Sequence, residues 1–278
     1  MILRVDTPLG EVAAMVTGQD PQSAPTLLLL HANPGDHRDF DAVIPEFGKD
    51  WSLVAVDWPG YGRSTAADPR SVTAAGLVDA AEAVLNTLVA KGFRQISVIG
   101  NSVGGYVAVR LAQRRPDLIT AVVLVQPAGF AGVNPGTRAV CRLMGTRAIA
   151  RYAVAPSARM YLGPRRTASQ QATYERAKQI PRDPRRLDVY CALWRSLADP
   201  QCDLVAESPL IPRIPVQVVW GTRDPINPWP LNRRGIARAL PQAEVVTLPT
   251  RHEPFSEDPD TFLDTVIPFF TRREGARS

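Results

Sequence analysis

The stretch Val98–Gly105, which reads Val-Ile-Gly-Asn-Ser-Val-Gly-Gly, decides how the rest of the chain is interpreted. An apolar run leads into Ser102, and a helix-like segment follows it. A serine held in a strained turn at the tip of a strand needs small residues two positions away on each side, and Gly100 and Gly104 meet that need. The turn would expose the serine hydroxyl and leave the N–H of Val103 free at the start of the helix. Because the same glycines could serve close packing alone, a reactive serine and a structural turn are both open at this point.

The composition indicates a soluble globular protein. The chain has 278 residues, of which 45% are hydrophobic and 21% charged, enough for one large or two small domains. Arg4 and Asp6 precede any apolar segment and no apolar run is long enough to cross a bilayer, so we expect no targeting segment and no membrane partner. Cys141, Cys191 and Cys202 are an odd number without metal-binding spacing, which predicts no disulfide framework, no zinc site and a cytoplasmic location.

The net charge of +5 does not by itself indicate a nucleic-acid partner. Lysine occurs only at positions 49, 91 and 178, and the arginines are spread along the chain without a basic run. No recognisable nucleic-acid-binding module accompanies them, so we expect no nucleic-acid binding. The sequence makes no prediction about oligomeric state.

Hydrophobic patterning predicts an α/β fold with a doubly wound, mostly parallel sheet of eight strands and helices on both faces. Two alternating segments at the N-terminus predict an antiparallel edge, and apolar runs that alternate with helix-like segments predict right-handed crossovers. The expected strands are residues 2–6, 11–17, 26–30, 51–57, 95–100, 120–126, 216–220 and 244–248. The expected helices are residues 37–47, 72–90, 103–114, 230–240 and 258–272.

This alternation stops after residue 126, and a segment of helical character follows. We therefore predict a core domain of residues 1–126 and 213–278, interrupted by a helical cap of residues 127–212. The clearest helix of the cap has one apolar stripe, for which packing against the core is expected and contact with a ligand is the alternative. The stripe comprises Leu187, Tyr190, Trp194 and Leu197.

Two loops near the C-terminus supply partners for Ser102. Asp224 follows the strand at residues 216–220, and His252 follows the last predicted strand. The chain has two other histidines, His31 and His37, and both lie in or beside the first polar loop, so His252 is the candidate base. The order Ser102, Asp224, His252 differs from the orders found on other serine-protease folds. Asp224 is preferred as the acid because its rivals, Glu253 and Asp258, share the loop of the histidine.

Five motifs in order make the chain resemble the α/β-hydrolase superfamily over essentially its whole length. His31-Ala32-Asn33-Pro34-Gly35 resembles the H-G-x-P loop of that superfamily, and Asp57–Ser64 resembles its D-x-P-G-x-G-x-S loop. The remaining three are the motifs of Ser102, Asp224 and His252. This resemblance implies a nucleophile elbow, an oxyanion hole formed by the N–H groups of Asn33 and Val103, a lid over residues 127–212, and no metal or cofactor.

The resemblance predicts a serine hydrolase that cleaves a small ester or related acyl substrate through an acyl-enzyme. Ser102 stands where haloalkane dehalogenases and epoxide hydrolases carry aspartate, so those activities are not expected. The acid-poor cap likewise argues against an aminopeptidase. Two alternatives stay open. The elbow is similar to that of the hydrolases that cleave C–C bonds in diketo acids, although Glu253 stands where those enzymes often carry tryptophan. A ligand sensor with negligible turnover is the other alternative.

An excess of positive charge in the predicted cap raises the possibility of an anionic substrate. Residues 126–212 contain thirteen Lys and Arg against six Asp and Glu. A solvated arginine face on surface helices is the expected interpretation. The alternative is a clamp, in which near-helical spacing and adjacent pairs let some of the arginines bind a carboxylate or phosphate. The arginines concerned are Arg138, Arg142, Arg147 and Arg151, with the pairs Arg165-Arg166 and Arg185-Arg186.

Overall fold

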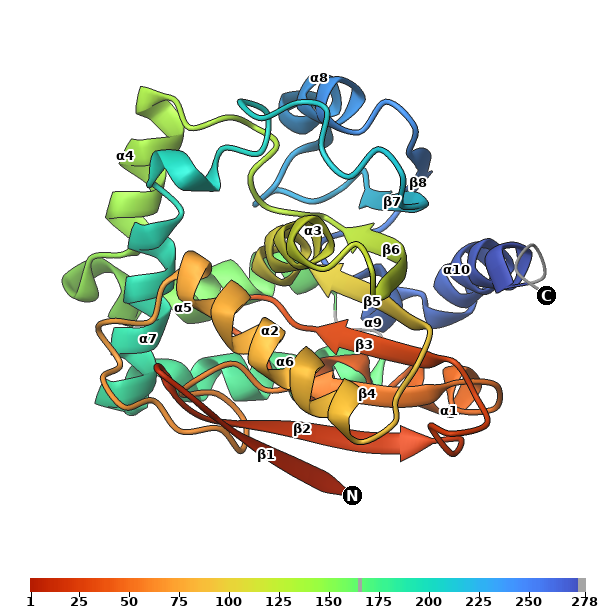
Figure 1. The fold of residues 1–278 in the computed structure, drawn as a ribbon. Helices are drawn as coiled ribbons and strands as arrows, with labels where there is room; N and C mark the ends of the chain where they lie inside the picture. Colours follow the sequence, from red (N-terminus) through yellow and green to blue (C-terminus); the bar gives the residue numbers. More distant parts are fainter. Residues whose placement is uncertain (165–166, 275–278) are drawn as a thin grey trace.

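A computed structural model describes residues 1–164 and 167–274 and shows a single eight-stranded sheet (Figure 1). The strand order is β1-β2-β4-β3-β5-β6-β7-β8. β1 and β2 pair antiparallel, and β2 pairs antiparallel with β4, whereas every later pair is parallel. The predicted mostly parallel sheet with an antiparallel edge is therefore confirmed. The strands are β1 (Ile2–Thr7), β2 (Gly10–Gly18), β3 (Thr26–Leu30), β4 (Ser52–Val56), β5 (Ile96–Asn101), β6 (Ile119–Val125), β7 (Val216–Gly221) and β8 (Glu244–Leu248).

Helices cover both faces of the sheet because side chains of the central strands alternate between two hydrophobic cores. In β3, Leu28 and Leu30 belong to one core, and Leu27 and Leu29 belong to the other. The first core contains residues of α2 (Ala74–Ala90), α3 (Val103–Arg114) and α8 (Trp229–Ala239). The second contains residues of α1 (Ile44–Phe47), α9 (Pro254–Glu257) and α10 (Pro259–Glu274).

The prediction of a single helix over residues 37–47 is wrong. The chain instead forms the 3₁₀ helix η1 (His37–Phe40) and then the short helix α1. Pro45 explains the break, because a proline lacks the N–H that a continuous helix would need and its ring clashes with the carbonyl four residues earlier. Pro45 is tolerated in the first turn of α1, so the second helix starts there.

Between β6 and β7 the described residues form four α-helices and two short 3₁₀ helices. Figure 1 shows the arrowheads of β3 and β5 directed towards the side where α4, α5 and α7 lie, so this segment is beyond the carboxyl ends of the parallel strands. Its buried residues Val154, Tyr190 and Leu204 belong to the same core as α2 and α3. The elements are α4 (Pro135–Met144), α5 (Arg147–Leu162), α6 (Ala168–Gln179), η2 (Ile180–Arg182), α7 (Pro184–Ser196) and η3 (Pro200–Cys202).

Candidate active site

Ser102 lies at the junction of β5 and α3 in a strained conformation, with φ of 55° and ψ of −114°. Its N–H donates to the carbonyl of Val125 on the neighbouring strand, at 3.0 Å. The two flanking glycines are sterically required. A Cβ on Gly100 would lie 2.3 Å from the carbonyl oxygen of Gly104, and a Cβ on Gly104 would lie 2.2 Å from that of Leu30. The turn that the sequence predicts is therefore present, and it holds the serine where strand and helix meet.

His252 and Asp224 form a buried hydrogen-bonded pair. The Nδ1 atom of His252 lies 2.6 Å from the Oδ2 atom of Asp224, and the two residues come from the loops that follow β8 and β7. Burial alone would raise the pKa of Asp224, but the charge and hydrogen bond of His252 and the N–H groups of Ile226 and Asn227 lower it below its ordinary value. An ionised Asp224 fixes the Nδ1–H tautomer and leaves Nε2 of the imidazole free to accept a proton.

The rival acids do not reach the histidine ring. The carboxylate of Asp258 accepts from the N–H of Thr261, at 3.3 Å, near the start of α10. The carboxyl oxygens of Glu253 are buried and have no hydrogen-bond partner among the residues that the structure describes. The geometry thus brings Asp224, and not its neighbours along the chain, to His252.

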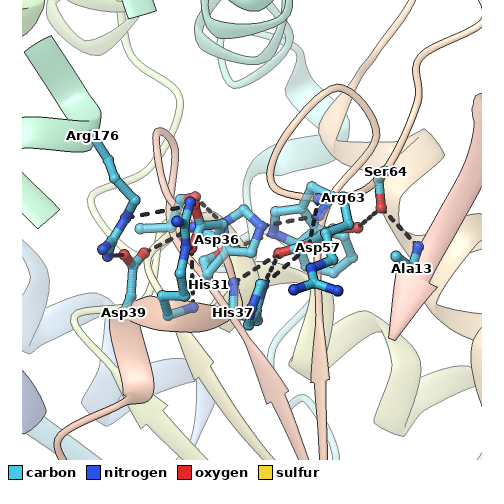
Figure 2. Close-up of polar contacts among 12 residues, drawn as sticks. Ala13, His31, Asp36, His37, Asp39, Asp57, Arg63, Ser64 and Arg176 are labelled. Atoms are coloured by element: carbon cyan, nitrogen blue, oxygen red, sulfur yellow. Dashed lines mark hydrogen bonds and ion pairs between the residues drawn. The ribbon is translucent and has the colours of Figure 1, made fainter. Parts of the chain in front are cut away.

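The other two histidines are parts of the loops beside Asn33. The ring of His31 is fully buried: its Nδ1 donates to the carbonyl of Ala32, at 2.7 Å, and its Nε2 accepts from the N–H of Trp58, at 2.9 Å. Burial lowers the pKa of His31, which keeps the ring neutral. The Nδ1 of His37 lies 2.9 Å from the carboxylate of Asp57 (Figure 2).

Asn33 and Val103 lie side by side at the cavity that also contains Ser102 and His252. The structure gives neither backbone N–H an acceptor among its described residues. The side chain of Asn33, by contrast, is fully engaged: its Oδ1 accepts from the Tyr61 hydroxyl, at 2.7 Å, and its Nδ2 donates to the Tyr190 carbonyl of α7, at 3.3 Å. Its side-chain amide is therefore held from two sides.

Three residues that the sequence did not indicate hold the loop of Arg251 and His252. The Nδ2 of Asn101 donates to the carbonyl of His252, at 3.2 Å, and the Nε2 of Gln126 donates to the carbonyl of Arg251. The backbone carbonyl of Tyr161, at the C-terminal end of α5, accepts the backbone N–H of His252 at 3.3 Å, and the Tyr161 ring packs edge-on against the His252 ring. Asn101 ends β5 and Gln126 directly follows β6, positions that could have indicated them, whereas nothing in the sequence connects Tyr161 with the histidine.

Ser102 and His252 open onto one cavity of about 650 Å³ between the sheet and the inserted helices. Its walls are mostly apolar, and no Asp, Glu, Lys or Arg lines it in the described part of the chain. The stripe on α7 packs against the core as expected, since Leu187 and Tyr190 belong to that core and Trp194 and Leu197 pack against it. Tyr190, Trp194 and Leu197 also line the cavity, which keeps the ligand-contact alternative open at these three positions. Val140 of α4 and Leu231 of α8 line the cavity and are 54% and 67% exposed, which locates its mouth between these two helices.

The arginine clamp, which was the alternative to a solvated face, is not assembled by the described residues. Arg138 and Arg142 lie on α4, whereas Arg147 and Arg151 lie on α5 beyond the break at Gly145. Arg147 pairs with Asp188, Arg186 pairs with Asp183, and Arg185 donates to the carbonyl of Ala66. Arg165 and Arg166 lie outside the described residues.

One group of potential metal ligands is present in the described ranges, namely Asp36, His37 and Asp57. Protein donors already engage their oxygen atoms. Asp36 binds the guanidinium of Arg38, and Asp57 accepts the N–H groups of His37 and Arg63, both at 2.8 Å (Figure 2). The group therefore fits a hydrogen-bonded support for the Asn33 loop better than a metal centre. No helix in the described ranges is both long and apolar enough to cross a membrane.

Comparisons with known proteins agree with this architecture. Residues 25–259 match the family model described as alpha/beta hydrolase fold. An uncharacterized protein of Mycobacterium tuberculosis is 26% identical over 273 residues, which cover 91% of this chain and 77% of that protein. The enol-lactonase of Burkholderia xenovorans LB400 superimposes with a TM-score of 0.79 at 22% identity, covering 97% of this chain and 100% of that one. A thermophilic esterase from Thermogutta terrifontis gives a TM-score of 0.76 at 21% identity, with 98% and 99% covered. The chain belongs to the α/β-hydrolase fold family.

Proposed function

We propose that this hydrolase cleaves an uncharged, largely apolar ester by an acyl-enzyme mechanism. Ser102 attacks the carbonyl carbon, and Nε2 of His252, oriented by Asp224, accepts its proton and passes it to the leaving alcohol. The N–H groups of Asn33 and Val103 stabilise the oxyanion, and water activated by His252 then releases the acid. Residues 127–212 act as the cap that encloses the substrate. The mechanism as proposed calls on no metal or cofactor.

The observation that carries this proposal is the meeting of three features in one cavity. The strained Ser102, the His252–Asp224 pair and two N–H groups without acceptors surround the same space of about 650 Å³. A volume of this order accepts a small or medium-sized organic molecule. The esterase and the enol-lactonase named above share this fold, which supports ester or lactone chemistry without identifying the substrate.

The walls of the cavity favour a neutral substrate over an anionic one. Without Lys or Arg in the described lining, a buried carboxylate would have no cation to compensate for its lost hydration. This argues against the C–C hydrolase alternative, because a diketo acid carries such a carboxylate. The free thiols Cys141, Cys191 and Cys202 support the cytoplasmic location that the sequence predicts.

The decisive experiment replaces the nucleophile. Ser102→Ala should lower ester turnover by about 10³-fold or more and abolish covalent labelling by a fluorophosphonate. Ser157→Ala is the matched control, because Ser157 also lines the cavity but lies within α5 and not at the turn that precedes α3, and it should keep both properties. Near-wild-type turnover by Ser102→Ala would refute the proposal. Labelling of the wild type without turnover on a panel of esters, thioesters, lactones and diketo acids would indicate the ligand sensor instead.

A further inference from the structure

Large apolar side chains are exposed on the helices around the mouth of the cavity. Among the described residues, nine such side chains are exposed, and five of the nine lie on α4, α5 and α8. Three of the five, Val140, Met160 and Leu231, also line the cavity and therefore lie at its rim. The other two are Leu143 of α4 and Tyr152 of α5. A soluble protein rarely gathers exposed apolar groups in one place unless another molecule covers them, so these helices indicate an interaction surface.

The same three helices carry positive charge alone. They contain eight arginines and no Lys, Asp or Glu, whereas the rest of the chain contains 24 basic and 27 acidic residues. Within the described part of the chain, Arg147 is the one member of the eight with an acidic partner, Asp188. We therefore expect the partner of this surface to be anionic. The exposed arginines without an ion pair are Arg142, Arg151, Arg159, Arg233, Arg234 and Arg238.

Helical spacing puts apolar and basic side chains on the same outer faces. On α8, Leu231, Arg234 and Arg238 are separated by three and four positions and so follow one another along one face. On α4, Val140 and Leu143 are three positions apart and likewise share a face. Helices of this kind lie in the interface of a bilayer, with apolar side chains among the acyl chains and guanidinium groups at the lipid phosphates.

Charge and apolar exposure together favour a lipid surface over a second copy of this chain and over a nucleic acid. A second copy docked through the same face would set arginine-only helices against each other, and like charges repel. A nucleic acid would pair with the arginines but would offer no apolar interior to Leu143 and Leu231. A bilayer with anionic headgroups accommodates both kinds of side chain. We propose that α4, α5 and α8 dock this protein on an anionic lipid surface, with the mouth of the cavity towards the lipid.

In this orientation the cavity receives its substrate from the lipid. Its mostly apolar walls continue outward into Val140, Met160 and Leu231, so a neutral ester passes from the bilayer to Ser102 without crossing water. This consequence rests on the proposed function, whereas the docking itself does not. The sequence predicted no membrane partner because it shows no spanning run, but peripheral docking needs none.

Co-sedimentation with vesicles tests the proposal, using phosphatidylcholine alone and phosphatidylcholine mixed with phosphatidylglycerol. The wild type should bind the mixed vesicles about tenfold or more tightly than the neutral ones, and added salt should weaken this binding. The double variant Arg142→Gln/Arg234→Gln should bind the mixed vesicles about twentyfold more weakly, since each arginine near an anionic surface strengthens binding about fivefold. Leu143→Asn should weaken binding about tenfold, because it removes an apolar side chain from the contact. None of these three residues lines the cavity.

Matched controls come from the segment where α2 leads into the amino end of β5, which lies away from α4 (Figure 1). Arg94→Gln and Val89→Asn remove an exposed arginine and an exposed valine there, and both variants should bind vesicles like the wild type. Ser102→Ala should also bind like the wild type, which separates docking from the proposed catalysis. Circular dichroism of each variant checks that it is folded.

Several results would overturn the proposal: no binding to vesicles, equal binding to neutral and anionic vesicles, or equal losses in the control variants. Binding to soluble polyglutamate or duplex DNA without binding to vesicles would overturn it too, because the partner would then be an acidic protein or a nucleic acid. Self-association that Leu143→Asn abolishes, without vesicle binding, would identify a second copy as the partner instead. Binding to mixed vesicles by a protein that hydrolyses no ester would refute the proposed function alone.

Discussion

Tyr61 shows how one hydroxyl group outside the reacting set can control the proposed oxyanion site. It donates to Oδ1 of Asn33 while the amide nitrogen of Asn33 reaches the carbonyl of Tyr190, so the asparagine is held from both sides. The backbone N–H of Asn33 owes its direction to these two contacts. A hydrogen-bond donor that is already in position needs no reorganisation energy during the reaction, whereas a loosely held donor needs some and stabilises the transition state less.

Tyr61→Phe should therefore lower kcat by about tenfold and leave KM nearly unchanged, because the proposed hydrogen bond strengthens only as negative charge develops on the substrate oxygen. Steady-state kinetics with a neutral ester, normalised to the fraction of sites labelled by a fluorophosphonate, would measure this. Tyr152→Phe removes a hydroxyl from an exposed tyrosine on α5 and serves as the control. A rise in KM without a change in kcat would instead mean that Tyr61 orders the binding site for the ground state.

At the scale of elements, the junction of β5 and α3 leaves no room for a side chain at its glycines. Gly104→Ala would place a Cβ 2.2 Å from the carbonyl oxygen of Leu30, so either β3 or the helix start has to move. We expect a loss of about 3 kcal/mol in the free energy of unfolding, measured by urea denaturation, together with a large loss of turnover. Gly92→Ala has a strained φ of +90° but no atom within 4 Å of the new Cβ, and it should cost only about 1 kcal/mol. Equal losses in the two variants would contradict the steric argument.

The sequence predicted the elements of the core far better than it predicted their contacts. Periodicity gave the bounds of β3 and α3 as the structure has them, because both are long apolar patterns ended by clear turn signals. The helix over residues 37–47 failed because Pro45 was not weighed as a break. The residue types and order of Ser102, Asp224 and His252 were readable because loops at the carboxyl ends of parallel strands converge. Tyr161 was not readable, since the contact joins segments about ninety residues apart through an irregular insertion.

For the molecule as a whole, we expect the distribution of charge to influence which substrates enter the cavity. The inserted segment has an excess of basic residues, but none lines the cavity in the described ranges. The solvated-face alternative thus describes these arginines better than the clamp. Because these arginines are solvated, their electrostatic effect on a substrate is screened over about 10 Å at 0.1 M ionic strength.

A pair of esters matched in size, one neutral and one with a free carboxylate on its acyl chain, should show whether the cavity prefers an uncharged substrate. We expect kcat/KM for the neutral ester to be about a hundredfold higher, because the carboxylate would be buried without a cation. The value for the neutral ester should not change between low and moderate salt. Preference for the anionic ester, with kcat/KM that decreases as salt increases, would restore the clamp and the C–C hydrolase alternative.

Two helices of the insertion, α4 and α5, are attached to the core in different ways. The C-terminal end of α5 is fastened to the loop of the base: the guanidinium of Arg251 donates to the carbonyl of Met160, and His252 donates its N–H to Tyr161. By contrast, α4 places exposed apolar side chains such as Val140 at the mouth of the cavity. In laboratory evolution for new substrates, we therefore expect substitutions on the two helices to have different effects. Changes on α4 alter what enters without touching the base, whereas changes at Met160 or Tyr161 alter selectivity and rate together.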